Sequence, residues 1–273
     1  MKDPDVSVII STYNQPEWLR KVLWGYNQQT YKNVEVIVAD DGSDTKTSQL
    51  IESLRKEVFY PIKHVWQEDS GFQKTKILNK AILETSTDYL IFTDGDCIPR
   101  QDFVASHLNK RRLNCFLSGG YFKLPEQTSN LITKEHIDKQ NCFEELWLIK
   151  HGVKKSFKMN KLRRGTFKTW FLNTFTTTKA TFDGMNASAW KKDIINVNGF
   201  DERMTYGGED RELGERLMNM GVRPIQARYS LVCLHLYHER PYKNNISLSK
   251  NNAIRKSTKQ NKTVFTEFGL VKN

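Results

Sequence analysis

The feature that most constrains the fold is a regular alternation of strand and helix patterns over the first 120 residues. Continuous apolar, β-branched runs predict buried strands at residues 6–10, 34–39, 62–66 and 89–93, with a fifth starting at 115–117. Apolar side chains at helical spacing predict helices between them, at residues 16–26, 50–58 and 77–82. Strands joined by helices form right-handed βαβ units, so we expect an α/β fold with a mostly parallel central sheet flanked by helices.

Three polar clusters directly follow the first, second and fourth predicted strands: residues 11–15, residues 40–44 and Asp94-Gly95-Asp96. Ligands of such sheets bind at the carboxyl ends of the strands, so we expect these clusters to form one site. The two carboxylates of the last cluster can present hard oxygen ligands to Mg²⁺ or Mn²⁺, which would bridge the phosphates of a nucleotide. The alternative is an acidic turn, and the position at a strand end favours the metal site.

The second cluster suits recognition of a nucleobase. A carboxylate there can accept the N3–H of a uracil ring, and we assign this contact to Asp41, with Ser11 and Tyr13 closing the pocket from the first strand. Ser43 and Asp44 suit the simpler role of helix N-caps.

Two later motifs carry further candidates. Gly207-Gly208-Glu209-Asp210 opens a predicted helix over residues 209–220. Acids in a first turn are stabilised by the helix dipole without any catalytic role, but the paired glycines let the backbone approach a ligand. The strand-like segment 225–237 leads to His235 and His238, and a neutral imidazole can complete the coordination of a metal. Because side chains alternate along a strand, we expect at most one of these two to serve.

Together these motifs resemble the inverting family 2 glycosyltransferases of the GT-A fold. The run from Gly199-Phe200-Asp201-Glu202 to Gly207-Gly208-Glu209-Asp210 is similar to the C-terminal region of galactosyltransferases and of bacterial chondroitin-type polymerases. The resemblance covers roughly residues 5–122 and 181–240. We therefore expect one catalytic domain over residues 1–242, with a nucleotide-sugar-binding half at 1–122, a basic aromatic insert at 146–182, an acceptor-binding half at 183–242 and a basic C-terminal extension at 243–273.

The resemblance implies a role for each matching residue. Asp210 would be the general base, and Glu209 beside it would help to bind the acceptor. Asp96 would be the principal metal ligand, with Asp94 facing the ribose or the metal and His238 as a late metal-binding histidine. The other implied donor contacts are Ser11, Tyr13, Asp41, Lys74, Lys76, Asn79 and Gly95. The implied acceptor contacts are Gly184, Asn186, Gly207 and Gly208.

The implied activity is transfer of a hexose or N-acetylhexosamine from a UDP-sugar to a saccharide acceptor, with inversion and with Mn²⁺ or Mg²⁺. The expected setting is synthesis of a bacterial surface polysaccharide: capsule, O-antigen or lipooligosaccharide. Tyr206 stands where relatives often carry Trp before the paired glycines, which leaves the sugar open. A nucleotidyltransferase on a similar sheet is one alternative, although residues 11–15 lack the glycines of a phosphate loop. A basic nucleic-acid-binding protein is another.

The formal charge of +11 is unevenly placed. Residues 146–182 contain nine bases and no acid, and residues 243–273 contain seven bases and one acid, which leaves 26 bases and 30 acids elsewhere. Aromatic residues interleave with the bases of the insert, a pattern that suits nucleic acid, an anionic membrane or a solvated basic loop. With the resemblance, we expect contact with a lipid-linked or acidic glycan acceptor and peripherally with an anionic membrane, and no nucleic acid partner.

Other features bear on location. No apolar run approaches the roughly 18 residues of a membrane span, and the apolar stretch at 6–10 is too short for a signal peptide. The four cysteines lack Cys-x-x-Cys spacing, so neither a zinc site nor a disulfide framework is indicated. We expect a cytoplasmic protein, peripheral at the inner face of the membrane, with a C-terminal tail beyond Tyr242 that is loose at its end.

Overall fold

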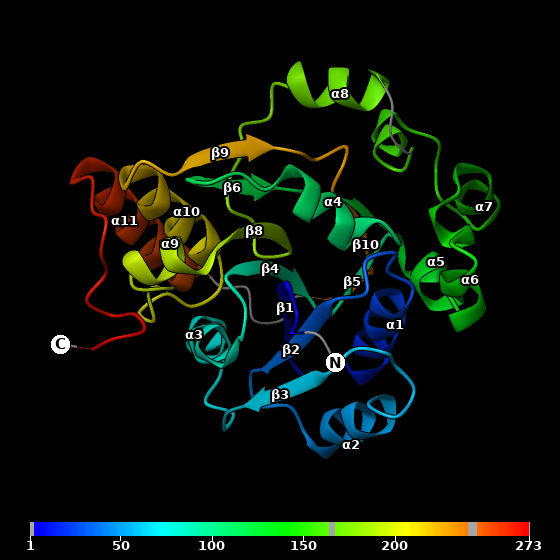
Figure 1. Cartoon of the computed structure of the whole chain (residues 1–273), viewed down its shortest axis with the longest axis horizontal. Helices are drawn as coiled ribbons and strands as arrows, with labels where there is room; N and C mark the ends of the chain where they lie inside the picture. Colours follow the sequence, from blue (N-terminus) through cyan, green and yellow to red (C-terminus); the bar gives the residue numbers. More distant parts are fainter. Residues whose placement is uncertain (1–2, 164–166, 240–244, 273) are drawn as a thin grey trace.

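The computed structural model describes residues 3–163, 167–239 and 245–272. The strands of its main sheet are β1 (Val6–Thr12), β2 (Val34–Asp40), β3 (Ile62–Trp66), β4 (Tyr89–Asp94), β6 (Cys115–Ser118), β8 (Asn186–Trp190) and β9 (Arg223–Gln226). Within this described part, the seven strands lie in the order β3-β2-β1-β4-β8-β6-β9, and only β8 runs against its neighbours (Figure 1). The α/β class with a mostly parallel sheet is confirmed.

Helices cover both faces of this sheet. They are α1 (Pro16–Asn27) and α2 (Thr45–Leu54) on one face, and α3 (Lys74–Glu84), α9 (Lys191–Asn196) and α10 (Glu209–Asn219) on the other. Side chains of β1 alternate between the two layers: Val8 and Ile10 pack with α1 and α2, whereas Ile9 packs with α3 and α10. Burial on both faces explains why the central strands are continuous apolar runs.

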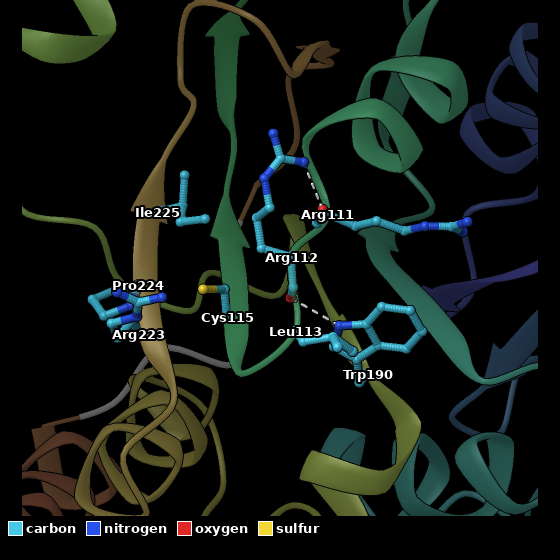
Figure 2. Close-up of a pocket in the computed structure, with 8 residues that line it drawn as sticks. All are labelled: Arg111, Arg112, Leu113, Cys115, Trp190, Arg223, Pro224 and Ile225. Atoms are coloured by element: carbon cyan, nitrogen blue, oxygen red, sulfur yellow. Dashed lines mark hydrogen bonds between the residues drawn. The ribbon is translucent and has the colours of Figure 1, made fainter.

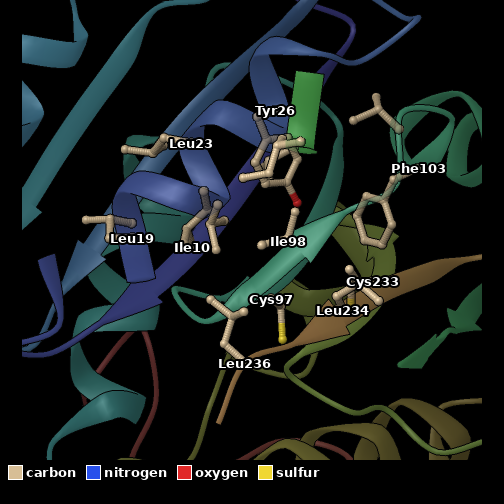
Figure 3. Packing of buried hydrophobic residues seen from close by; sticks show 14 of the residues in the cluster. Ile10, Leu19, Leu23, Tyr26, Cys97, Ile98, Phe103, Cys233, Leu234 and Leu236 are labelled. Atoms are coloured by element: carbon tan, nitrogen blue, oxygen red, sulfur yellow. The ribbon is translucent and has the colours of Figure 1, made fainter. Parts of the chain in front are cut away.

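A smaller sheet lies beside α1 and contains β5 (Cys97–Pro99), β10 (Val232–His235) and β7 (Gly120–Lys123), in that order. Figure 3 shows its buried residues Ile98 and Leu234 within the same apolar cluster as Leu23 and Tyr26 of α1. β10 runs antiparallel to β5, with His235 opposite Cys97. This pairing brings the late histidines to the strand that follows the Asp94-Gly95-Asp96 motif.

The segment between β7 and β8 is helical in several short pieces. They are α5 (Glu126–Leu131), α6 (Lys134–Asp138), η1 (Asn141–Phe143), α7 (Glu145–Lys150), η2 (Phe157–Lys161) and α8 (Phe167–Thr174), after α4 (Phe103–Lys110) earlier in the chain. Arg164 of the predicted insert lies outside the described residues. In the described part of the chain, no helix combines the length and the apolar character that a membrane crossing needs.

The prediction of a loose C-terminal tail is wrong. Helix α11 (Asn245–Gln260) packs against α10, where Arg255 pairs with Glu215 and the Thr258 hydroxyl donates to Glu212. Farther on, Val271 donates its backbone N–H to Asn198. The predicted boundary between residues 242 and 243 falls within 240–244, which lie outside the described residues.

Candidate active site

A cavity of about 890 Å³ opens at the carboxyl ends of β1 and β4. It is where the structure brings most of the predicted site residues together. Those that line it are Ser11, Tyr13, Asp41, Lys74, Asp94, Gly95, Asp96, Gly207, Gly208, Glu209, Asp210 and His238. The strand-end clusters and the start of α10 therefore face one space, as the rule for parallel sheets predicts.

The buried carboxylate of Asp96 lies against two imidazoles. Its Oδ2 is 3.0 Å from Nε2 of His238 and 4.0 Å from Nε2 of His235. Nδ1 of His235 donates to the Leu236 carbonyl, and Nδ1 of His238 to the Glu239 carbonyl, so both rings present Nε2 to Asp96. The expectation that the two histidines point to opposite faces is wrong, because β10 ends at His235 and strand alternation does not extend to His238.

This donor set fits a hard or borderline divalent cation. A carboxylate oxygen and imidazole nitrogens whose other ring nitrogen is fixed by a backbone carbonyl are features of protein metal sites. Asp96, His235 and Cys97 offer ligand atoms within 4.8 Å of one another. Burial raises the pKa of the Cys97 thiol well above its ordinary value, so it stays neutral and is the poorest ligand of the three. All four cysteines are buried and free.

Asp94 is held by an ion pair at the centre of the cavity. Its Oδ1 accepts hydrogen bonds of 2.6 Å from both Lys74 Nζ and Ser11 Oγ. Burial alone would raise the pKa of Asp94, but the Lys74 ammonium outweighs it, so the pKa lies below its ordinary value. Burial likewise opposes the charge on Lys74, yet Asp94 and Glu209 raise its pKa above the ordinary value. Both groups are therefore charged at neutral pH.

The acids of α10 face this lysine from the other side. Gly207 and Gly208 have φ values of 108° and 87°, a conformation that suits glycine, and the Gly207 N–H donates to Glu209. The Gly184 N–H donates to Oδ2 of Asp210 at 2.8 Å. Burial, and then the charge of Asp210, raises the pKa of Glu209 to about 7.

Asp183 is a cavity residue that sequence reasoning missed. Burial raises its pKa to about 7, with further contributions from the charges of Asp210 and Asp94. It directly precedes the predicted Gly184, but an isolated Asp carries no distinguishing sequence signal. The result is a cluster of carboxylates around the ammonium group of Lys74.

At the predicted nucleobase end, Asp41 is fixed by two donors. Its Oδ1 accepts from the Gln67 side chain at 2.6 Å, and its Oδ2 accepts from the Gln73 backbone at 2.9 Å. Burial raises the pKa of Asp41. The Tyr13 hydroxyl, instead of meeting Asp41, donates to Asp69 at 2.8 Å. These partners come from the loop after β3, which carries no recognisable motif.

Comparison with known proteins decides the family. Residues 7–144, just over half of the chain, match the family described as glycosyl transferase family 2. The chain belongs to this family. Residues 173–240, which contain Asp183, Glu209, Asp210 and both histidines, match the family described as the N-terminal domain of galactosyltransferase.

Curated relatives of this family 2 protein are longer than the chain. It is 30% identical to the uncharacterized glycosyltransferase YfnE of Bacillus subtilis, over 85% of this chain and 64% of YfnE. It is 28% identical to the chondroitin synthase of Escherichia coli, over 79% of this chain and 32% of the synthase. The chain thus spans between about one third and two thirds of the length of these relatives.

Two solved structures show that the fold is GT-A. The mannosyltransferase PcManGT from Pyrobaculum calidifontis, in complex with GDP-Man and Mn²⁺, superposes with a TM-score of 0.60 at 20% identity, covering 89% of this chain and 59% of that one. TarS of S. aureus, in complex with UDP-GlcNAc, superposes with a TM-score of 0.59 at 16% identity, covering 87% and 60%.

Four residues implied by the family 2 resemblance are not among those that line the cavity, and one of them, Gly184, adjoins it through its hydrogen bond to Asp210. Lys76 and Asn79 lie on α3 but are not among its lining residues. The buried Asn79 amide instead holds the backbone of Phe200, donating to its carbonyl and accepting from its N–H. Asn186 is 1% exposed, and its amide donates to the backbone carbonyls of Gly120 and Leu231. The predicted ligand contacts of Asn79 and Asn186 are therefore wrong. Both side chains have a structural role, because their amide groups form hydrogen bonds with buried backbone groups.

The C-terminal helix of this family 2 protein forms one wall of the cavity, which the sequence did not predict. Asn251 is completely buried, and its Nδ2 donates hydrogen bonds of 3.0 Å to the carbonyls of Thr205 and Gly207. A side chain at Gly207 would meet Leu248 at 2.4 Å, so α11 and the glycine loop are in close contact. The α11 residues that line the cavity are Leu248, Asn252 and Arg255.

We expect Asn251→Asp to lower the rate of sugar transfer about tenfold and the free energy of unfolding by about 2 kcal/mol, because the substitution removes both donated hydrogen bonds while keeping the side-chain shape. Thermal unfolding and initial rates measure the two effects. Lys256→Ala, at an exposed position of the same helix, is the matched control. Unchanged behaviour of Asn251→Asp would show that the helix does not position the glycine loop.

We also expect a pH-dependent stability effect at Asp183. Its pKa of about 7 lies above the ordinary Asp value of roughly 3.9, so the folded state holds the proton more tightly than the unfolded state. The free energy of unfolding of the wild-type protein therefore falls as the pH rises from roughly 3.9 to about 7. Asp183→Asn has no group that titrates here, so its stability does not show this decrease. The melting temperature of the variant relative to wild type should be higher at pH 8 than at pH 5. A difference independent of pH would contradict the assignment.

A second hollow, of about 840 Å³, lies at the opposite end of the sheet. Cys115 begins β6 and Trp190 ends the reversed strand β8, so both mark the amino-end edge. Figure 2 shows the guanidinium groups of Arg111, Arg112 and Arg223 pointing apart around it. This divergent arrangement is separate from the candidate active site.

Proposed function

We propose that the protein is a metal-dependent, inverting glycosyltransferase that transfers a hexose or N-acetylhexosamine from a UDP-sugar to a saccharide acceptor. The observation that carries the proposal is the shared cavity: the Asp96–histidine set and the acid pair of α10 face one space. A single displacement needs a base on the acceptor side and charge neutralisation on the leaving side, and these two groups supply them.

Asp210 is the proposed general base. Its Oδ2 is oriented by the Gly184 N–H, and the start of α10 stabilises its negative charge. It takes the proton of the acceptor hydroxyl as the bond to the anomeric carbon forms, so no covalent intermediate is needed and the anomeric centre inverts. Glu209, whose pKa of about 7 lets it exchange a proton near neutrality, would bind an acceptor hydroxyl beside it.

Asp96 and His238 would hold the Mn²⁺ or Mg²⁺, with His235 close enough to join them. Such a cation acts as a Lewis acid that neutralises charge on the departing diphosphate. Lys74 contributes a fixed positive charge to the same region, balanced in the free protein by Asp94. Ser11 and Asp94, joined by a hydrogen bond, line the same cavity.

Asp41 is the proposed uracil contact, and two hydrogen-bond donors already orient it. TarS in complex with UDP-GlcNAc and PcManGT in complex with GDP-Man both have this fold. The identity of the nucleobase is therefore the feature of the donor to test. The similarity to chondroitin synthase supports a saccharide acceptor in the synthesis of a bacterial surface polysaccharide.

The test is a panel of UDP-linked and GDP-linked sugars, incubated with Mn²⁺ and scored for release of the nucleoside diphosphate. We expect turnover with one or more UDP-sugars and a loss of that preference in Asp41→Ala. Lys46→Ala, at an exposed position on α2, is the control for non-specific effects. Equal turnover of UDP- and GDP-sugars by the wild-type protein would contradict the assignment of Asp41.

A further inference from the structure

Helix α8 turns its aromatic side chains toward the solvent and its polar side chains toward the protein. Phe167, Trp170 and Phe171 point outward, with exposed fractions of 77%, 58% and 45%, and Phe175 just beyond the helix is 63% exposed. Positions three and four apart lie on one face of a helix, so these side chains form a contiguous aromatic stripe. A helix that packs on a water-exposed domain normally turns its apolar stripe inward, so packing within the described residues does not account for this face.

Polar contacts hold α8 from its inner side. Thr169 is buried, and the Asn173 side chain donates to Ser230 and accepts from the Tyr229 N–H. Polar side chains of the inner face therefore form hydrogen bonds with the protein. The outer side carries the four aromatic side chains, three from the helix and Phe175 just after it. Figure 1 shows α8 at the outer margin of the molecule, beyond β9 and β6.

Positive charge accompanies the stripe. Residues 146–182 contain no acid, and Phe157, which is 68% exposed, lies among three exposed lysines. The exposed lysines of this segment are Lys150, Lys154, Lys155, Lys158, Lys168 and Lys179. Exposed aromatics interleaved with lysines complement the headgroup region of a negatively charged bilayer, where rings enter the interface and ammonium groups meet lipid phosphates.

We propose that α8 and the lysines at 154, 155 and 158 form a docking surface for an anionic lipid bilayer. An acidic glycan would also attract the lysines, but ligand sites for saccharides are concave, and these aromatics protrude. Phe175 precedes Asp183, a lining residue of the cavity, by eight residues, so the surface adjoins the cavity along the chain. The proposal does not depend on the transfer reaction.

The experiment is flotation of the full chain with vesicles of phosphatidylcholine, alone or with about 30 mol% phosphatidylglycerol. We expect wild type to float with the anionic vesicles only. The triple variant Phe167→Ser, Trp170→Ser, Phe171→Ser should bind at least about tenfold more weakly. The triple variant Lys154→Gln, Lys155→Gln, Lys158→Gln should lose about fivefold for each lysine removed.

Matched controls come from exposed positions elsewhere on the surface. Lys56→Gln, Lys80→Gln, Lys192→Gln removes the same charge, and Leu83→Ser removes an apolar side chain that is 59% exposed. Both controls should float like wild type. Bromine-labelled lipid should quench part of the tryptophan fluorescence, and Trp170→Phe should lose that part while still binding.

Three results would overturn the proposal. The first is wild-type protein that remains unbound with anionic vesicles. The second is retention by an acidic polysaccharide or an oligonucleotide, with no flotation, which would assign the surface to that polymer. The third is self-association that the aromatic variant abolishes, again with no flotation, which would assign the stripe to a second copy of the chain. Thermal unfolding of each variant verifies that it is folded.

Discussion

Asp210→Asn is expected to reduce sugar transfer about a thousandfold, within the range that general-base catalysis supplies. The asparagine side chain can still accept the hydrogen bond from Gly184, so the geometry of the loop should be retained while the proton acceptor is lost. Binding of UDP should stay within about twofold of wild type, because the hydrogen bonds that orient Asp41 come from Gln67 and Gln73 and do not involve Asp210. Initial rates and calorimetric titration with UDP separate the two effects.

Glu209→Gln is the informative companion to this variant. If Asp210 is the base and Glu209 binds the acceptor, the Glu209 variant should mainly raise KM for the acceptor, whereas the Asp210 variant should mainly lower kcat. A wild-type rate of transfer by Asp210→Asn would show that another group takes the proton. Glu209 and Asp183 would then be the next candidates, since the pKa of each lies at about 7.

Asp96→Ala is expected to abolish metal-dependent turnover. The substitution removes the carboxylate that faces both His235 and His238, so the proposed metal site loses the oxygen ligand beside the two imidazoles. The affinity for Mn²⁺, measured by titration in the absence of any sugar, should fall at least about 100-fold, the upper range for loss of an outer-sphere partner. This binding measurement does not depend on which sugar the enzyme uses.

Asp88→Ala is the matched control, because Asp88 is an exposed acid directly before β4, at the end opposite to the Asp94-Gly95-Asp96 motif. It should bind Mn²⁺ like wild type. His238→Ala should weaken Mn²⁺ binding more than His235→Ala, since Nε2 of His238 is 1.0 Å closer to Asp96 (3.0 against 4.0 Å). Unchanged Mn²⁺ affinity in Asp96→Ala would place the metal elsewhere.

The sequence by itself determined four neighbouring strands of the sheet and the strand-end half of the site. The predicted strands at 6–10, 34–39, 62–66 and 89–93 correspond to β1, β2, β3 and β4 within two residues at either end, because a strand buried on both faces must be a continuous apolar run. Parallel strands then carry whatever follows them to a common edge. The local pattern alone was therefore enough to predict that Asp41, Asp94 and Asp96 share one site, and all three line the cavity.

Tertiary structure decided the other half. His235 and His238 face Asp96 because β10 pairs with β5, and no local pattern encodes a pairing between such distant segments. Asn79 and Asn186 matched family motifs, but their side chains form hydrogen bonds with backbone groups that come close only in the folded chain. The wall formed by α11 and the outward aromatic face of α8 likewise follow from long-range contacts. A sequence pattern reports which side of an element is apolar, whereas the partner on that side is set by how the whole chain packs.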